Sequence, residues 1–451
     1  MTQPLLMPEI AREIHSLSRA DIVIGIPSYN NARTIAHVVR AAQAGLNKYY
    51  SQYKGIIINS DGGSTDRTRE EVLSAQLDDS SLWMLSTPLH PVHKLSFPYH
   101  GIPGKGSAFR MIFQIASQLQ AKACAVVDSD LRSITPEWID LLIRPVLHAH
   151  YDFVAPYYHR HKYDGTITNS IVYPLTRALY GLQVRQPIGG DFGLSSRLIN
   201  RYLARQDWET DVARYGIDIW MTSVAIAEGY RVCQSFLGAK LHDAKDPGAD
   251  LSAMLQQVVG SVFYLMSEYY PQWSRCNQSQ PVDLFGFCYD VGLDPIDVNL
   301  DRLLRTFQQA CADLGEVWAL SLREETLRML QALGGQCFAA ERDSFHMEDS
   351  LWVRIIYEFA TAYQQQPVNR NILLRSLTPL YLARVASFVV ETRSLYAPQV
   401  EEKIENLCKE FENQKGYLLD LWNARQCRKQ DQAGHPLPQD RLPVPDSLKE
   451  A

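Results

Sequence analysis

Short runs of apolar residues, each followed by a polar loop, constrain the fold of this chain more than any other feature. Residues 21–26 read DIVIGI, residues 55–59 read GIIIN and residues 123–127 read ACAVV. Runs of this length that are rich in β-branched residues are typical of buried strands. Helical periodicity follows two of them, over 34–46 and 67–77. Because strand, loop and helix repeat in this order, the sequence predicts an α/β domain with a mostly parallel central sheet.

The second part of the chain has a different pattern. Strand-like alternation becomes scarce after about residue 252, and amphipathic helices are expected over 300–314, 323–333, 348–363, 370–387 and 400–422. A chain of 451 residues suits two units that each bury a core. We therefore expect a catalytic α/β domain over 1–260, a helical region over 261–425 and a Pro-rich, charged, disordered tail over 426–451.

Composition narrows the class of protein. The net charge is −6, which does not favour a nucleic-acid partner. The eight cysteines form no CxxC pair, so we expect reduced thiols in a cytoplasmic protein rather than a zinc ribbon. We expect neither a secretory signal nor a transmembrane segment. The helical region offers a possible homodimer surface, although helices that pack on their own domain have the same pattern.

The segment Asp128-Ser129-Asp130 directly follows the run at 123–127. Ligands of open α/β sheets bind beyond the carboxyl ends of the strands. Two carboxylates at this spacing can reach one divalent cation, and Mg²⁺ or Mn²⁺ prefers oxygen ligands. A solvated turn is the alternative. His242 is a further candidate ligand, since neutral imidazole binds such ions, but a lone histidine is more often structural.

Other polar segments carry candidate binding residues. Asp61 lies in SDGGSTD, where a carboxylate can accept hydrogen bonds from a base or ribose; a turn with a helix N-cap is the alternative. Lys105 lies in GKG, where flanking glycines allow a phosphate to approach, but this is not a P-loop and a surface loop explains it equally well. Asp191 in QPIGGD can bind sugar hydroxyls, and Asp218 in YGID can lie near a reacting carbon. A structural turn and a helix cap are the respective alternatives.

Taken in chain order, these segments resemble a known fold. PSYNNARTI at 27–35, NSDGGSTD at 59–66 and the DSD segment resemble the nucleotide-diphospho-sugar transferase (GT-A) fold. PGKG, TPEWI, QPIGGD, GID and AKLH further resemble the retaining mannosylglycerate synthases and the related glucosyl-3-phosphoglycerate and glucosylglycerate synthases. The resemblance covers about residues 20–260 well and the helical region more loosely.

The resemblance implies a hexosyltransferase that retains anomeric configuration, uses Mg²⁺ or Mn²⁺, and moves glucose or mannose from a nucleoside-diphosphate sugar to D-glycerate or a similar small hydroxy acid. A compatible-solute role would follow from the family alone. The implied nucleotide-sugar residues are Pro27, Tyr29, Asp61, Lys105, Asp128 and Gly190. The implied metal residues are Asp130 and His242, with Asp128 in support, and the implied catalytic residues are Asp191, facing the donor sugar, and Asp218, beside the anomeric carbon.

Residues 158–168 resemble the glycerate-binding segment of mannosylglycerate synthase. Arg160, Asp164 and Thr168 stand at the positions of its acceptor-binding residues, and an arginine can bind a carboxylate with two parallel hydrogen bonds. Thr166, also expected at the acceptor, stands where the phosphoglycerate enzymes carry an arginine for the phosphate. That departure favours an unphosphorylated acceptor, unless His161 and Lys162 supply the charge. For Arg160, a surface charge is the alternative.

Competing functions stay open at this point. The same fold serves 3-phosphoglycerate, polyol, lipid or glycan acceptors, and a protein that only binds a nucleotide sugar would keep some of these motifs. A nucleotidyltransferase is disfavoured because PSYNNA follows the first strand in place of a Gly-rich, basic loop. No carboxylate is clearly a nucleophile, so we prefer front-face attack, in which the acceptor hydroxyl loses its proton to the leaving phosphate. The donor base and the choice between glucose and mannose are not determined by these residues.

Overall fold

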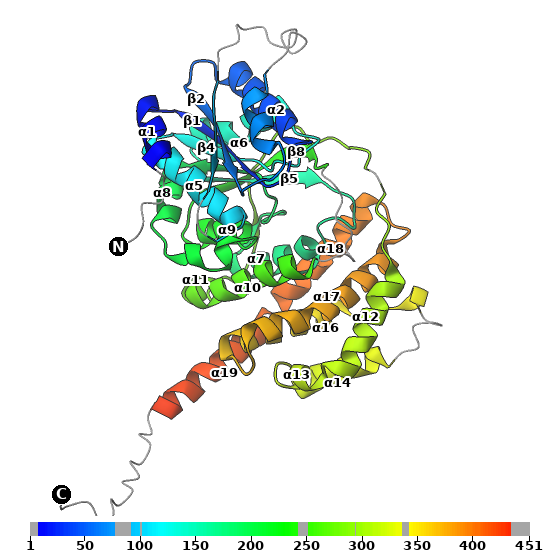
Figure 1. Cartoon of the computed structure of the whole chain (residues 1–451). Coiled ribbons are helices and arrows are strands. Elements are labelled where there is room, and N and C mark those ends of the chain that lie inside the picture. The colour runs from blue at the N-terminus through cyan, green and yellow to red at the C-terminus, as the bar shows by residue number, and fades with distance from the viewer. Residues whose placement is uncertain are drawn as a thin grey trace, which may run out of the picture.

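The computed structural model describes residues 8–76, 92–99, 102–241, 251–293, 295–335 and 342–433. Its centre is an eight-stranded sheet in the order β10-β8-β5-β7-β4-β1-β2-β3 (Figure 1). The strand β7 runs antiparallel to β4 and β5, and the other neighbours are parallel. The predicted α/β class with a mostly parallel sheet is therefore confirmed. The strands are β1 (Ile22–Ser28), β2 (Gly55–Asp61), β3 (His93–Pro98), β4 (Ala123–Val126), β5 (Phe153–His159), β7 (Phe192–Ser195), β8 (Val232–Ala239) and β10 (Leu284–Phe285), with a separate parallel pair β6 (Leu182–Gln183) and β9 (Gln280–Pro281).

Helices cover both faces of this sheet. Alternate residues of β1 point to opposite faces, so that Ile24 packs in the cluster of α2 and α6, and Val23 packs in the cluster of α5. Gly25 allows α5 to lie close, because a Cβ there would be 2.4 Å from a side-chain methyl of Ile112. The helices of this part are α1 (Pro8–Leu17), α2 (Ile35–Tyr49), α3 (Thr68–Ser74), α5 (Lys105–Gln118), α6 (Pro136–Ala149), η1 (Thr168–Val172), α7 (Tyr173–Tyr180), α8 (Ser196–Leu203), η2 (Asp207–Glu209), η3 (Asp211–Ala213) and α9 (Ile217–Ala227).

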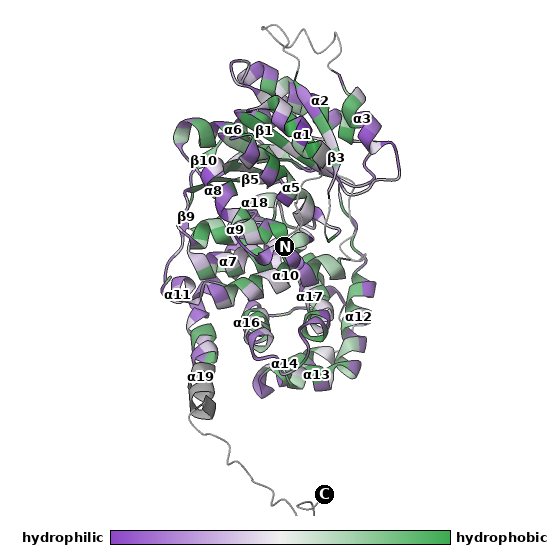
Figure 2. Ribbon diagram, turned by 60° about the vertical axis from the view of Figure 1, so that its left-hand side comes forward, coloured by the Kyte–Doolittle hydropathy of each residue, from purple (hydrophilic) through white to green (hydrophobic). Residues whose placement is uncertain are grey.

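The C-terminal half is helical, as predicted. In Figure 1 its helices lie below the sheet, and Figure 2 shows green and purple alternating along them, as amphipathic helices require. The expected helix over 400–422 is instead two helices that meet at Gln414. The tail expected to be disordered from 426 begins as helix, because α19 continues to Ala433; residues 434–451 lie outside the described part. The helices are α10 (Ser252–Glu268), α11 (Tyr270–Trp273), α12 (Leu300–Asp313), α13 (Gly315–Ala319), α14 (Glu324–Gly334), η4 (Arg342–Ser344), α16 (Asp349–Gln365), α17 (Arg370–Thr392), α18 (Ala397–Asn413) and α19 (Lys415–Ala433).

One apolar core runs through both halves. A single cluster of buried residues contains Phe109 of α5, Val259 of α10 and Leu377 of α17. The expected boundary at residue 260 lies inside α10, and whether the two halves fold separately stays a prediction. The helical half is therefore packed continuously against the α5 face of the sheet.

Polar contacts fix α18 and α19 against the sheet domain. The guanidinium of Arg177 in α7 forms ion pairs with Glu405 at 2.6 Å and Glu412 at 2.7 Å, both in α18. The ammonium of Lys415 donates to the carbonyls of Ala178 at 2.6 Å and Leu179 at 3.3 Å, at the end of α7. These contacts hold α18 beside the segment that follows β5.

Helix α17 is long and apolar enough to span a membrane, whereas the sequence was expected to contain no such segment. Among the described residues it is the one such helix, and 72% of its apolar window is buried inside the protein. The buried positions include Leu377, Leu380 and Ala383. Its apolar character is accounted for by packing within this chain.

Candidate active site

The polar loops that follow β1, β2 and β4 meet at one edge of the sheet, as predicted. The backbone N–H of Asn30 donates to the hydroxyl of Ser64 at 2.8 Å. The hydroxyl of Ser129 donates to the side-chain carbonyl of Asn31 at 2.8 Å. Since carboxyl ends of parallel strands share an edge, these contacts place the DSD turn beside the other two loops.

A lysine at the start of α5 links two of the predicted acids. The Lys105 ammonium lies 2.8 Å from Asp128 Oδ1 and 3.2 Å from Asp218 Oδ2. It also donates to the Gly190 carbonyl at 3.5 Å. The other carboxylate oxygen of Asp218 is buried, and among the described residues it has no hydrogen-bond partner. The structure thus brings together Lys105, Asp128, Gly190 and Asp218, which the sequence places up to 113 positions apart.

A second lysine, Lys240, joins the same cluster from the end of β8. Its ammonium lies 2.7 Å from Asp128 Oδ2 and 2.8 Å from Asp191 Oδ2. It also donates to the Gly189 carbonyl at 2.7 Å. An ammonium has three N–H donors, so these contacts satisfy all of them.

Asp191 lies deeper than expected. Its carboxylate is fully buried and accepts from the Asp128 backbone N–H at 2.7 Å, from Lys240, and from the Tyr158 hydroxyl. The family resemblance implies that Asp191 faces a donor sugar. Its oxygens instead accept hydrogen bonds from Asp128 and Lys240, so Asp191 holds these two residues in position.

Sheet topology explains why these acids meet. Val126 of β4 is paired with Phe192 of β7, and the two strands are antiparallel. The end of β4 therefore adjoins the start of β7, which places Asp128 beside Asp191. An all-parallel sheet would put these residues at opposite edges.

The charges of the cluster perturb one another. Burial alone would lower the pKa of Lys105, but the carboxylates of Asp128 and Asp218 outweigh it and raise that pKa. Burial opposes ionisation of Asp128 too, yet Lys105 and Lys240 hold its pKa well below the usual range. Burial, reinforced by the charge of Asp128, raises the pKa of Asp218 despite Lys105. Asp128 is thus held ionised, while Asp218 carries its charge at higher cost.

Glycines permit the close approach of these segments. Gly190 has φ +92°, and a Cβ there would lie 2.2 Å from Asp128 Oδ2. A Cβ on Gly106 would lie 1.8 Å from the carbonyl oxygen of Val212, which precedes the loop to Asp218. In the described structure, the glycine of GKG that follows Lys105 therefore serves helix packing.

The expected nucleotide residues differ in exposure. Asp61 is buried, and its carboxylate accepts from the Gly63 and Ser64 backbone N–H groups at 3.0 and 2.9 Å and from the hydroxyls of Ser28 and Ser64. It closes its own loop, which is the alternative considered above. Tyr29 is 61% exposed beside this loop, and Pro27 is buried in β1. Of Pro27, Tyr29 and Asp61, Tyr29 is therefore the residue whose side chain is exposed to a ligand.

The proposed metal residues lie partly outside the described structure. Asp130 is half-buried in the turn after β4. His242 lies in the undescribed segment 242–250, and the described residues contain no group of three histidine, cysteine or acidic side chains suited to a metal. The residue before His242 is placed, however. The backbone of Leu241 accepts from the N–H of Arg132 at 2.9 Å and donates to the Ser133 hydroxyl at 3.0 Å, next to the DSD turn. Oxygen ligands at this turn fit a hard divalent cation.

A cavity of about 400 Å³ adjoins the cluster, and Gly189 is in its wall. Three of the four expected acceptor residues, Arg160, Asp164 and Thr168, line it. Arg160 lies 3.7 Å from Asp164 Oδ2, and its guanidinium lies over the ring of Tyr158. Among the described residues, the buried Nε of Arg160 has no hydrogen-bond partner. This N–H is available to an acidic ligand.

The other cations of the cavity are already engaged. The Lys162 ammonium donates to the carbonyls of Thr392, Arg393 and Leu395 at 2.6, 3.1 and 3.2 Å. Arg185 forms a two-pronged ion pair with Glu401 at 3.0 and 2.8 Å. Burial, together with the charge of Lys162, lowers the pKa of His161, so its imidazole is neutral at pH 7. Arg160 is thus the cation best placed to receive an anion.

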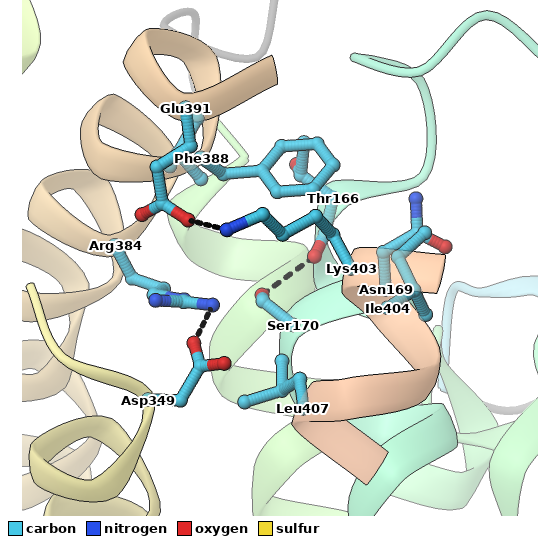
Figure 3. A pocket seen from close by; sticks show the side chains of 11 residues that line it. Thr166, Asn169, Ser170, Asp349, Arg384, Phe388, Glu391, Lys403, Ile404 and Leu407 are labelled. Carbon is cyan, nitrogen blue, oxygen red and sulfur yellow. Dashed lines mark hydrogen bonds and ion pairs between the residues drawn. The ribbon is translucent and has the colours of Figure 1, made fainter. Parts of the chain in front are cut away.

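Thr166 lies elsewhere. Its side chain is buried, and its hydroxyl is 2.5 Å from that of Tyr381 in α17. Figure 3 shows it among Arg384, Phe388 and Lys403, in a cavity of about 20 Å³ that has room for about one water molecule. The expectation that Thr166 binds the acceptor differs from this placement. Thr166 lines the small cavity, whereas Thr168, two residues later at the start of η1, lines the large one.

Two residues of the site, Lys240 and Tyr158, are not among those that the sequence motifs indicated. Lys240 stands in AKLH, where only the histidine drew attention. The Lys240 ammonium and the Arg160 guanidinium lie over the Tyr158 ring, 5.2 and 5.3 Å from its centre. The Tyr158 hydroxyl donates a hydrogen bond to Asp191. A lysine at the end of a mostly apolar strand was the available signal, because an ammonium there needs buried acceptors.

Comparison with known proteins gives matches among solved structures. No protein-family model matches the sequence, and neither does any curated protein. Glucosyl-3-phosphoglycerate synthase from Mycobacterium tuberculosis, in complex with Mn²⁺, UDP and glucosyl-3-phosphoglycerate, is 21% identical with a TM-score of 0.41, over 60% of this chain and 86% of that one. Its complex with Mg²⁺ and UDP is 22% identical with a TM-score of 0.40, over 57% and 83%. These enzymes are of the kind that the sequence motifs resemble.

Proposed function

We propose that this chain is a metal-dependent retaining hexosyltransferase that moves glucose or mannose from a nucleoside-diphosphate sugar to a hydroxyl of D-glycerate or a similar small, unphosphorylated hydroxy acid. The observation that carries the proposal is the cluster of Lys105, Lys240, Asp128 and Asp218 at the carboxyl edge of the sheet, next to a cavity that contains Arg160. Cations beside acids at such an edge suit a diphosphate and a sugar.

Lys105 is the group best suited to the diphosphate. It lies between two carboxylates and can exchange either contact for a phosphate oxygen by rotation of its own side chain. Lys240 has no such freedom, because its three hydrogen bonds tie it to the interior. We therefore assign diphosphate binding to Lys105, and the fixing of Asp128 to Lys240.

A divalent cation fits the turn after β4. Asp130 and Asp128 would hold it with His242, which follows the hydrogen-bonded Leu241. When bound, the cation supplies neutralisation of the charge that develops on the departing diphosphate. Once Lys105 binds the diphosphate instead of Asp128, Asp128 Oδ1 would be free to bind the cation.

Asp218 is assigned to the reacting sugar carbon. Its unpartnered, buried oxygen can stabilise the positive charge of an oxocarbenium-like transition state. The bond from the anomeric carbon to the diphosphate oxygen breaks, and the acceptor oxygen bonds to that carbon from the same face. The hydroxyl proton passes to the leaving phosphate oxygen. Front-face attack is preferred because each of the three carboxylates in the described cluster, Asp218 included, is paired with a lysine.

The charges of the cavity favour a carboxylate without a phosphate. His161 is neutral, Lys162 is held by three carbonyls and Arg185 is held by Glu401. Arg160, whose Nε has no hydrogen-bond partner among the described residues, is therefore the arginine best placed to receive an anion. A phosphoglycerate would bring a second, doubly charged group without a partner, at considerable desolvation cost.

The test is product analysis by mass spectrometry. The purified chain is incubated with UDP-glucose or GDP-mannose, Mn²⁺ and either D-glycerate or 3-phosphoglycerate. We expect a hexosylglycerate that disappears with EDTA or with Asp130→Ala. Arg160→Met should raise the KM for glycerate roughly 10- to 150-fold, the equivalent of one charged hydrogen bond. Arg393→Met, an exposed surface change, is the control. Preference for 3-phosphoglycerate would refute the unphosphorylated acceptor, and absence of transfer from any donor would refute the enzyme.

A further inference from the structure

The cavity beside the cluster is large for a three-carbon acid. Its volume of about 400 Å³ lies within the range of roughly 300–1,000 Å³ found for sites that enclose drug-sized ligands. The donor sugar does not account for it, because Lys105, Asp128, Asp191 and Asp218 are absent from its described lining. An acid held at Arg160 would leave most of this space unfilled.

The wall away from the sheet has a mixed chemistry. It is supplied by the start of α18 and the segment before it, where Ala397, Pro398, Val400 and Ile404 present apolar surface. Glu401 lies among them with its carboxylate on Arg185. Aliphatic groups are thus interleaved with a charged, hydrogen-bonding carboxylate.

The opposite wall shows the same mixture. Tyr157 and Ile188 supply apolar surface, and Asn169 and Gln186 supply amides. The side-chain carbonyl of Gln186 is buried and, among the described residues, has no hydrogen-bond partner. A purely apolar group would leave this Gln186 oxygen without a partner, which is costly. A hexosyl ring has apolar C–H faces and hydroxyl edges and would satisfy both kinds of surface.

We propose that the acceptor site extends into a second subsite that binds a hexosyl unit, so that the preferred acceptor is a glycoside of a small hydroxy acid rather than the free acid. This inference rests on the proposed function and narrows its acceptor class. Arg160 holds the acid, and the walls formed by Tyr157, Gln186 and the start of α18 hold the hexosyl ring.

The experiment compares three acceptors with the full-length chain, UDP-glucose or GDP-mannose, and Mn²⁺: D-glycerate, glucosylglycerate and phenyllactate. We expect kcat/KM for glucosylglycerate to exceed that for glycerate at least 10-fold. Ala397→Trp adds bulk at an exposed position of the wall and should reduce turnover of glucosylglycerate at least 10-fold with little effect on glycerate. Glu402→Trp is the control, because it is exposed on the same helix and does not line the cavity.

The failures of the two proposals are distinguishable. Equal kcat/KM for glycerate and glucosylglycerate, with Ala397→Trp changing neither, overturns the subsite and leaves the transferase intact. A preference for phenyllactate overturns it in favour of an apolar acceptor. If no acceptor is glycosylated, calorimetric titration with glucosylglycerate still decides: binding that Ala397→Trp weakens supports the subsite, and no binding overturns it.

Discussion

Removal of the Lys240 ammonium is the sharpest test of the charged cluster. Lys240→Met deletes contacts of 2.7 Å to Asp128, 2.8 Å to Asp191 and 2.7 Å to the Gly189 carbonyl. Two carboxylate oxygens that shared one cation would then face each other, and Asp191 is fully buried. Loss of one partner from a buried ion pair costs about 3–5 kcal/mol. Asp128 keeps Lys105, and Asp191 keeps Tyr158 and the Asp128 N–H, so we expect this range rather than the sum of the deleted contacts.

The measurement is thermal unfolding followed by circular dichroism. At roughly 2–4 °C per kcal/mol for a domain of this size, Lys240→Met should lower the Tm by roughly 6–20 °C. Lys122→Met is the matched control, because its side chain is 49% exposed and its 3.0 Å ion pair with Asp21 is worth at most about 1 kcal/mol. Equal small shifts in the two variants would refute the three contacts of Lys240.

Three further changes have distinct outcomes. Asp218→Ala should lower kcat roughly 100-fold while calorimetric UDP binding is kept, and unchanged turnover would remove Asp218 from the mechanism. Burial alone would raise the pKa of Asp152, but hydrogen bonds from Arg197, Ser195 and the Arg231 N–H outweigh it and lower that pKa from 3.8. The ionised Asp152 therefore stabilises the folded protein fully above pH 3.8, and this stabilisation is lost as the pH falls through the pKa that Asp152 has in the folded state. The difference in urea midpoint between the wild type and Asp152→Asn should therefore shrink from pH 6 to pH 3, and a constant difference would contradict it. Gly106→Ala puts a Cβ 1.8 Å from the Val212 carbonyl and should cost about 1–3 kcal/mol in urea unfolding, whereas Gly315→Ala, with open space around it, should cost nothing.

Local sequence patterns were sufficient to predict part of the central sheet and several C-terminal helices. The runs at 21–26, 55–59 and 123–127 predicted three strands, because a buried strand must be apolar over a few consecutive residues. Amphipathic periodicity likewise predicted α12, α14, α16 and α17 of the C-terminal half, although it joined α18 and α19, since the pattern continues across Gln414.

Only the tertiary structure shows which segments that are far apart in the chain lie close together. Asp128 and Asp191 adjoin only because β7 is inserted antiparallel between β4 and β5, and nothing in the local sequence of β7 states its direction. The same holds for Lys240, whose three acceptors come from segments 49 to 112 positions away. Thr166 and Thr168 look equivalent in sequence, yet the hydroxyl of Thr166 contacts that of Tyr381, whereas Thr168 lines the large cavity.

The sequence by itself determined three strands of the sheet, several of the C-terminal helices and the polar residues that follow those strands, because these features depend on neighbours within a few positions. The tertiary structure decided which acids share a lysine, which cation of the cavity keeps an N–H without a partner among the described residues, and that α18 forms a wall of the cavity. Those features depend on strand order and on the packing of distant helices, and the free energy that selects them comes from the whole core rather than from any one segment.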